Sequence, residues 1–241
     1  MSINVAINGF GRIGRNVFRI IQDNPNINVV AINDLTDPKT LAHLLKYDSV
    51  HGKFNAEIKC NEKYLFINKN KISYSRETEL SKINWKKNNV DIVLECTGKN
   101  NSKEKSFQHI KNGAKKVIVS APCKNADKTI VFGVNDEFLT KDDQIISAAS
   151  CTTNCLAPVL HVLNENFKIE KGFMTTIHAF TSDQRILDNS HKDPRRARSA
   201  SQSIVPTSTG ASKAISEIIP SLKGKIEGIA MRVPTPNVSL I

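Results

Sequence analysis

Hydrophobic and polar positions follow two different patterns along this chain, and the change falls near residue 150. Before that point, short β-branched or apolar runs such as Ile3–Ile7 and Val90–Glu95 alternate with helical stretches such as Ser102–Asn112. Continuous apolar runs of this length are typical of buried strands, and strands interleaved with helices predict a parallel, doubly wound sheet. The pattern therefore predicts an α/β first half.

Further elements of the first half follow from the same criteria. They are a helix through Val17–Ile21, a strand over Val29–Asn33, a helix over Leu41–Tyr47, three short strands over Glu57–Asn61, Tyr64–Asn68 and Lys71–Tyr74, and a strand over Lys116–Ser120. The three short strands are expected to form an antiparallel insertion. Ligands of doubly wound sheets bind at the carboxyl ends of the strands. We therefore expect Asn8, Asp34, Thr97 and Ser120 on one rim.

The second half begins with a long apolar helix. From Cys151 onward the apolar residues have the spacing of one buried helical face; they are Leu156, Val159, Leu160, Val162, Leu163 and Phe167. Beyond it, the pattern predicts a strand over Phe173–Thr181, a helix over Ala211–Ile219 and a strand over Ile226–Met231. The change of pattern predicts a domain boundary between residues 150 and 151.

A glycine motif follows the first strand. Gly9, Gly11 and Gly14 form G-x-G-x-x-G at a strand-to-helix turn. The first glycine permits the tight turn, the second lets the backbone approach a pyrophosphate, and the third allows close packing of the helix on the strand. The motif alone is weak, but Asp34 follows the next strand twenty positions after Gly14, where an acid can bind the hydroxyls of an adenine ribose. Together these residues predict a dinucleotide site.

Composition narrows the class of protein. The 241 residues carry 34 Lys and Arg against 23 Asp and Glu, a formal net charge of +11. Many of the lysines lie among asparagines, which indicates a solvated surface rather than a nucleic-acid site. The five cysteines are scattered, the N-terminus has no secretory signature, and no apolar stretch reaches the ~20 residues that span a membrane. We expect a cytoplasmic protein in a reducing compartment, with no membrane partner.

Cys151 lies at the predicted start of the second-half helix, where free amides and the helix dipole favour an anion. A helix end supplies about 0.3–1 kcal/mol, and up to ~2 when partly buried. Lowering a thiol pKa from ~8.5 to ~6.5 needs about 2.7 kcal/mol. A reactive thiolate at Cys151 therefore needs a partner as well, and a histidine is the expected one. An inert buried thiol is the alternative, but the polar neighbours of Cys151 argue against it.

His178, near the end of its predicted strand, is the leading candidate for that partner. Spacing alone leaves the pairing open. His161 is expected to pack beside the helix, and the other histidines lie in polar or helical surroundings. A cysteine–histidine pair can serve acyl transfer by a protease-like route as well as an oxidation. Only the oxidation explains why a dinucleotide site precedes it.

Other residues of the second half favour anionic ligands. Ser208–Gly210 opens a helix and offers hydroxyls and amides, and Arg198 and Arg232 supply positive charge for phosphate. Cys151 and Cys155 fall one helical turn apart and could form a metal or disulfide pair. No second Cys/His pair has zinc spacing, so we expect no metal.

The whole chain carries, in order, the segments NGFGRIGR, NDLTD, LLKYDSVHG, ECTG, SCTTNCLAP, HAFT, HKDPRRAR, PTSTGA and MRVPTPNVS. Through these segments it resembles the phosphorylating glyceraldehyde-3-phosphate dehydrogenases. The resemblance implies an α/β Rossmann-type doubly wound parallel sheet over residues 1–150, which binds NAD. It implies an α+β catalytic domain over residues 151–241, incomplete relative to the family, and a homotetramer at full length.

The resemblance also implies the chemistry. Cys151 would attack the aldehyde of D-glyceraldehyde 3-phosphate to form a thiohemiacetal, and His178 would activate the thiol and take the hydroxyl proton as hydride passes to NAD. Inorganic phosphate would attack the resulting thioester to give 1,3-bisphosphoglycerate, as in glycolysis and gluconeogenesis. The Cys151 amide and His178 would stabilise the oxyanion.

Ligand contacts carry over by position. The expected cofactor contacts are Gly9, Gly11, Arg12, Ile13, Gly14, Asp34, Arg76, Thr97 and Ser120. Thr181 and Arg232 are expected to bind the phosphate of the substrate, and Arg198 to lie close to both phosphates. The attacking phosphate is expected at Ser150, Thr152, Thr209 and Gly210.

Some residues depart from the family pattern. Asn189-Ser190 stands where NAD-specific members commonly carry Leu-Pro, and this resembles members that accept NADP. Asp34-Leu35 resembles the NAD-using pattern, because Asp34 would repel a 2′-phosphate. We expect NAD, with use of NADP left open. Ser182 and Pro194 replace a usual asparagine and leucine, which would change subunit contacts.

The chain stops at Ile241, inside what the family continues as a strand. The resemblance therefore implies that further strands, a final helix and an asparagine that orients the nicotinamide are missing. We expect this piece to be poorly active and to expose apolar surface. Two alternatives stay open: an erythrose-4-phosphate dehydrogenase, whose thioester is released to water, and nucleic-acid binding through the basic loop Lys192–Arg198.

Overall fold

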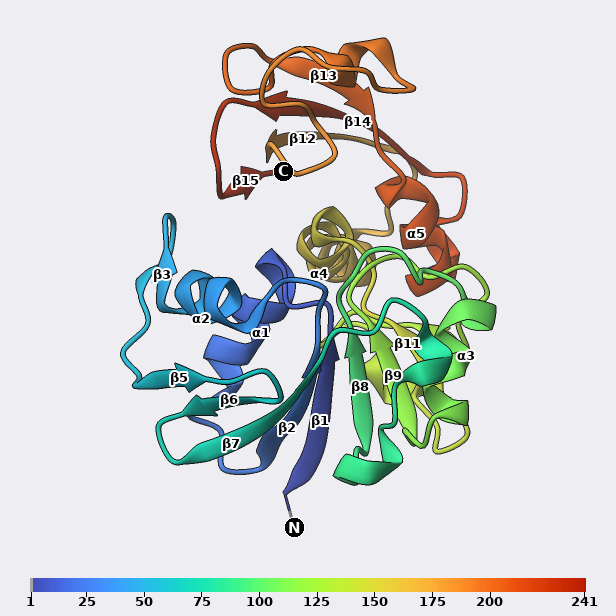
Figure 1. The fold of residues 1–241 in the computed structure, drawn as a ribbon. Helices are drawn as coiled ribbons and strands as arrows, with labels where there is room; N and C mark the ends of the chain where they lie inside the picture. Colours follow the sequence, from blue (N-terminus) through green and yellow to red (C-terminus); the bar gives the residue numbers. More distant parts are fainter. Residues whose placement is uncertain (1) are drawn as a thin grey trace. The chain divides into compact units, whose positions relative to one another are not determined.

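A computed structural model describes residues 2–241 of the chain, and two compact units are seen in it (Figure 1). The first unit extends to Thr129 and includes Leu139–Ala149. The second consists of Ile130–Phe138 and Ser150–Ile241. The segment Ile130–Phe138 precedes residue 150 in the chain and yet belongs to the second unit.

A nine-stranded sheet forms the first unit, in the order β10-β11-β9-β8-β1-β2-β7-β6-β5. Its strands are β1 (Ile3–Asn8), β2 (Ile27–Asn33), β5 (Ile58–Cys60), β6 (Tyr64–Ile67), β7 (Asn70–Ser75), β8 (Ile92–Glu95), β9 (Lys116–Val119), β10 (Lys128–Thr129) and β11 (Ile145–Ser147). Every pairing from β10 across to β7 is parallel, and β5 and β6 extend the edge in antiparallel pairing. The predicted parallel α/β sheet is confirmed, and β7 joins the predicted antiparallel insertion to it.

Strand β1 lies between β2 and β8, so the chain first builds the sheet on one side of β1 and later on the other. This arrangement creates a topological switch point, where ligands of such sheets bind outside the carboxyl ends. Asn8 ends β1 and Glu95 ends β8 at this point.

Helices cover both faces of the sheet (Figure 1). They are α1 (Arg12–Ile21), α2 (Pro38–Lys46) and α3 (Lys103–Lys111), with short 3₁₀ turns η1 (Leu80–Lys82) and η2 (Lys86–Asn88) and a hairpin of β3 (Tyr47–Asp48) and β4 (Gly52–Lys53). Ile7 packs with Phe18 and Leu41 in one buried cluster, whereas its neighbour Ala6 packs with Trp85 in another. Successive strand residues point to opposite faces, so this sheet is buried on both sides.

The second unit contains a mixed four-stranded sheet in the order β13-β14-β12-β15. Its elements are α4 (Cys151–Phe167), β12 (Gly172–Ala179), β13 (Val205–Ser208), α5 (Ala211–Ile218), β14 (Ile226–Val233) and β15 (Ser239–Leu240), with 3₁₀ turns η3 (Asp136–Phe138), η4 (Pro194–Ala197) and η5 (Pro220–Leu222). Strands β12 and β14 are parallel, and the other pairs are antiparallel. Helix α5 contacts both α4 and β14.

The predicted buried face of α4 is wrong in part. Leu156 and Leu160 are buried, but four of the six apolar residues are exposed, namely Val159, Val162, Leu163 and Phe167. The buried stripe is completed by small or polar residues, namely Thr152, Thr153, Ala157 and Asn164. The spacing of apolar residues identifies a helix, but when apolar residues lie on two faces it does not tell which face another element covers.

One face of the four-stranded sheet carries exposed apolar side chains. They are Phe173, Ile177, Ile229 and Leu240, which the strand register places on the same side. Within residues 2–241, no helix combines the length and the apolarity that crossing a bilayer requires.

Candidate active site

The turn between β1 and α1 leaves room for a ligand. Gly9 has a φ of +90°, and a Cβ there would lie 2.7 Å from the backbone nitrogen of Thr97. A Cβ at Gly14 would lie 2.3 Å from the carbonyl oxygen of Gly9, so this helix start must pack closely on the turn. At Gly11, in contrast, a Cβ would meet nothing within 4 Å, and no side chain caps α1. The open amides at this helix end fit an anionic group such as a pyrophosphate.

Asp34 connects the end of β2 to the glycine turn. One carboxylate oxygen accepts a hydrogen bond of 2.6 Å from the amide of Phe10, and the other accepts one of 2.9 Å from the amide of Thr36. A carboxylate has further lone pairs that can accept from a ribose. Arg76 donates to the carbonyl oxygen of Leu35 at 3.0 Å, which places a cation next to this loop.

The remaining predicted cofactor residues also lie in the first unit. Arg12 forms an ion pair with Asp48, and Ile13 is 50% exposed. Burial raises the pKa of Asp48, but the amides of His51 and Val50 and the charge of Arg12 outweigh it and lower that pKa to about 2. Two further predicted contacts lie beside Glu95. The amide of Thr97 donates to the Glu95 carboxylate, and the amide of Ser120 donates to the Glu95 backbone carbonyl.

Cys151 is the first residue of α4, and its sulfur lies 3.1 Å from Nε2 of His178. Ser150 caps the helix by accepting a hydrogen bond of 3.1 Å from the amide of Thr153. The hydrogen bond with His178 is the largest cause of a lowered pKa at Cys151, about 7; burial opposes it, and the charge of His178 and hydrogen bonds from Thr152 add to it. Cys151 thus has a histidine partner in the structure, and this partner lowers the thiol pKa further than a helix end alone could.

The second ring nitrogen of His178 has two partners. Nδ1 lies 2.7 Å from the carbonyl oxygen of Ala179 and 2.7 Å from Nη1 of Arg232, the residue opposite His178 in the β12–β14 register. A guanidinium only donates and a carbonyl only accepts. A ring without a proton on Nδ1 can therefore accept from Arg232, and a ring protonated at Nδ1 can donate to Ala179, which leaves Nε2 able to take up a proton. The ring is held in either protonation state.

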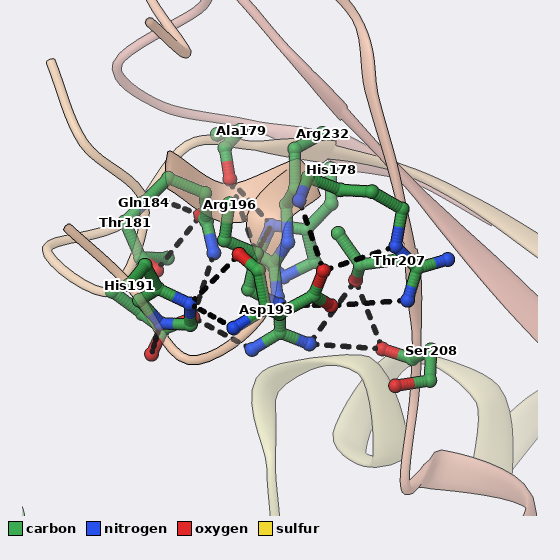
Figure 2. A network of polar contacts seen from close by, with 12 residues as sticks. His178, Ala179, Thr181, Gln184, His191, Asp193, Arg196, Thr207, Ser208 and Arg232 are labelled. Atoms are coloured by element: carbon green, nitrogen blue, oxygen red, sulfur yellow. Dashed lines mark hydrogen bonds and ion pairs between the residues drawn. The ribbon is translucent and has the colours of Figure 1, made fainter. Parts of the chain in front are cut away.

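A polar network surrounds His178 and Arg232 (Figure 2). The side chain of Gln184 accepts hydrogen bonds from the amide and hydroxyl of Thr181, at 3.0 and 3.1 Å. Arg196 forms an ion pair of 2.7 Å with Asp183 and donates to Thr207 at 3.3 Å. The Nε atoms of Arg196 and Arg232 are buried without a hydrogen-bond partner. The Nε of Arg196 still lies 3.7 Å from a carboxylate oxygen of Asp193, so it is the unsatisfied donor of Arg232 that indicates a place for an anionic ligand.

The structure brings Arg196, and not Arg198, into this network. Arg198 is exposed and pairs with Asp188 at 3.2 Å. The two arginines lie two positions apart at the end of the turn η4, so their side chains take different directions. Sequence reasoning chose Arg198 and missed Arg196, because a run of three basic residues in four positions contains no signal of which one turns inward.

The residues predicted for the attacking phosphate lie at two helix starts. Ser150 and Thr152 flank Cys151 at α4, and the hydroxyl of Thr209 accepts from the amide of Ala211 at 3.2 Å as α5 begins. No side chain caps α5 at Gly210. Cys155 and Cys151 are both free thiols. Nowhere in residues 2–241 do three or more His, Cys, Asp or Glu side chains gather as a metal site would require.

Comparison with known proteins agrees with this arrangement. Residues 3–103 match the family described as glyceraldehyde 3-phosphate dehydrogenase, NAD binding domain, and residues 150–241 match its C-terminal domain. A glyceraldehyde-3-phosphate dehydrogenase of Geobacillus stearothermophilus is 57% identical over 242 residues, which cover 100% of this chain and 72% of the relative. Similar matches are glyceraldehyde-3-phosphate dehydrogenase 1 of Bacillus subtilis (strain 168), 55% identical over the same shares, and the enzyme of Clostridium pasteurianum, 56% identical over 98% of this chain and 71% of the relative.

Proposed function

Because the chain belongs to the glyceraldehyde-3-phosphate dehydrogenase family, we propose that it oxidises D-glyceraldehyde 3-phosphate to 1,3-bisphosphoglycerate. It is an NAD-dependent oxidoreductase that acts on an aldehyde. The observation that carries the proposal is the 3.1 Å contact between Cys151 and His178, which accompanies a thiol pKa of about 7. At neutral pH a large fraction of this thiol is the nucleophilic thiolate.

The cofactor is assigned to residues 1–150, and catalysis to residues 151–241. Gly11 and the first amides of α1 would hold the pyrophosphate, and Asp34 the adenine ribose. The other proposed contacts are Gly9, Arg12, Ile13, Gly14, Arg76, Thr97 and Ser120. When bound, NAD supplies the nicotinamide that accepts the hydride. Asp34 would repel a 2′-phosphate, which supports NAD over NADP.

The residues of the second unit account for the covalent steps. The thiolate of Cys151 attacks the aldehyde carbon, and the developing oxyanion accepts a hydrogen bond from the Cys151 amide and the proton of the protonated His178 ring, which gives the hydroxyl of the thiohemiacetal. Each donor of this kind is worth about 2.7–4 kcal/mol in a transition state. His178 then takes the hydroxyl proton as the carbon is oxidised to a thioester. Inorganic phosphate attacks the thioester, and Cys151 leaves as a thiolate beside the protonated ring.

Phosphate binding is proposed for the cationic network around His178. Thr181 and Arg232 would bind the substrate phosphate, and the buried Nε of Arg232, which has no hydrogen-bond partner, supports this. Arg196 adds a second positive charge to the network. The attacking phosphate would bind at the two helix starts, where the proposed residues are Ser150, Thr152, Thr209 and Gly210. Arg198 pairs with Asp188, so Arg196 replaces it in the proposal.

We propose the cytoplasm as the compartment and a homotetramer as the assembly. The exposed apolar face of β12, β14 and β15 supports this assembly, because a face of this kind is typical of protein–protein contacts.

The basic loop Lys192–Arg198 forms ion pairs with Asp183, Asp188 and Asp193. This partial neutralisation supports a structural role for the loop over nucleic-acid binding.

Cys151→Ser tests the covalent mechanism. Reduction of NAD or of NADP during oxidation of glyceraldehyde 3-phosphate would be followed, with and without phosphate. We expect a phosphate-dependent reaction that prefers NAD and is lost in Cys151→Ser, and an acylated Cys151 detectable by intact-protein mass spectrometry when phosphate is left out. Activity that persists in the serine variant would refute the mechanism. A rate independent of phosphate would instead favour the erythrose-4-phosphate dehydrogenase reaction.

A further inference from the structure

A buried carboxylate lies beneath the rim of the dinucleotide site. The side chain of Glu95, at the end of β8, is 0% exposed. One of its oxygens accepts from the amide of Thr97 at 2.8 Å and from the Thr97 hydroxyl. The other lies 2.6 Å from Nδ2 of Asn8, 2.9 Å from Nδ2 of Asn100 and 3.0 Å from Nε2 of His109. An isolated buried charge is very costly, so these hydrogen bonds must sustain it.

The donors to Glu95 are all neutral. Nε1 of Trp85 lies 2.9 Å from Nδ1 of His109, and an indole nitrogen can only donate. Nδ1 of His109 is therefore unprotonated, its proton lies on Nε2, and that proton is directed at Glu95. In the contact between His109 and Glu95, a neutral imidazole thus donates a hydrogen bond to the carboxylate, and the two do not form an ion pair.

The network reaches along the carboxyl ends of neighbouring strands. Asn8 accepts from Nδ2 of Asn33, at the end of β2, at 2.8 Å, and Asn33 accepts from the hydroxyl of Ser75, at the end of β7, at 2.8 Å. On its other side the carboxylate holds the amide of Thr97, whose backbone packs directly on Gly9. One buried anion therefore ties together the two sides of the topological switch point.

We propose that Glu95 is a positioning residue for the dinucleotide site, which holds the Gly9 turn and the Thr97 loop in their binding geometry before the cofactor arrives. The residues that would touch the cofactor lie on the rim, and Glu95 lies beneath them. Because these loops are ordered before NAD binds, binding costs less conformational entropy. The inference rests on the cofactor site of the proposed function, but it does not depend on the aldehyde chemistry.

Glu95→Gln tests the proposal. Both carboxylate oxygens face donors, so an amide in either orientation points its NH₂ group at another donor. We expect about a tenfold or greater loss of NAD affinity in calorimetry without aldehyde. We also expect faster hydrogen exchange, without cofactor, confined to residues 8–11 and 96–100. Alkylation of Cys151, in the other unit, should be unchanged, and this separates the proposal from a failure of the proposed chemistry.

Glu104→Gln is the matched control. It removes the same charge from an exposed carboxylate in the first turn of α3 and should leave NAD affinity and exchange as they are. If Glu95→Gln does not fold, Asn100→Ala, which removes one donor to the carboxylate, should weaken NAD binding in the same direction. Unchanged NAD affinity in the folded variant, or an exchange increase spread evenly over the first unit, would overturn the proposal.

Discussion

At the scale of single residues, the chemistry depends on partners distant in the sequence. Cys151 begins a helix, which favours its thiolate, but the larger effect on its pKa comes from the hydrogen bond with His178, 27 positions away. His178 in turn is held by Ala179 and by Arg232, so its ring stays aligned when its proton moves.

His178→Asn should raise the pKa of Cys151 from about 7 to its ordinary value or above, because the main stabilising contact is lost while burial remains. At pH 7 the thiolate fraction, and with it the alkylation rate by iodoacetamide, should fall by about tenfold or more. The measurement is the alkylation rate against pH. His161→Asn, in the middle of α4, serves as the control. An unshifted profile in His178→Asn would contradict the role given to this contact.

At the scale of elements, the helix starts are the points that the sequence marks most clearly. The side chains of Asp37, Ser102 and Ser150 accept hydrogen bonds from backbone amides and so cap α2, α3 and α4, respectively. Neither Gly11 nor Gly210 has a side chain that could cap its helix, although the hydroxyl of Thr209 accepts a hydrogen bond from the first amide of α5. The starts of α2 and α3 thus contribute mainly stability, whereas the starts of α1, α4 and α5 are those assigned to anions.

Ser150→Ala should destabilise α4. Loss of an N-cap costs about 1 kcal/mol, because the amide of Thr153 loses its acceptor. The free energy of unfolding in urea would measure this cost. Ser212→Ala removes the same hydroxyl from the second residue of α5, whose start has no side-chain cap; alanine is the better helix former, so stability should not fall. Equal effects of the two substitutions would argue against the capping role.

At the scale of the whole molecule, buried charge makes stability depend on pH. Burial raises the pKa of Glu95, but hydrogen bonds from His109, Thr97, Asn100 and Asn8 outweigh it and lower that pKa to about 2. A carboxyl group with a lowered pKa in the folded state stabilises the fold above its unfolded value of ~4.3, and this contribution is lost as pH falls toward the folded value.

Acid unfolding of the first unit should therefore set in between about pH 4 and pH 2. Trp85 is the only tryptophan of the sequence and lies in the Glu95 network, so its fluorescence reports this unit. In Glu95→Gln the free energy of unfolding of the first unit should be lower at neutral pH and should change less with pH through the acid range. In Glu62→Gln, which removes an exposed carboxylate before β6, the acid transition should stay as in the parent chain. Stability of the parent chain that is constant down to pH 2 would disprove the assignment.

Much of this protein could be predicted from the sequence, because much of it depends on neighbours along the chain. Strand and helix patterns, the glycine turn with Asp34, and a cysteine at a helix start all arise from short-range spacing. The sequence does not predict the hairpin β3–β4 or the short strands β10, β11, β13 and β15, because, apart from β11, these segments hold no run of apolar or β-branched residues.

Tertiary structure decided the contacts between residues distant in the sequence. The β12–β14 register places His178 opposite Arg232, and packing decides which stripe of α4 is covered and which arginine of η4 turns inward. The same holds for Glu95, whose partners Asn8 and His109 come from other elements. Local composition determines what an element is and which reactive groups it carries. Only the packed chain determines which of those groups lie within hydrogen-bond distance, because that distance depends on register and burial and not on spacing.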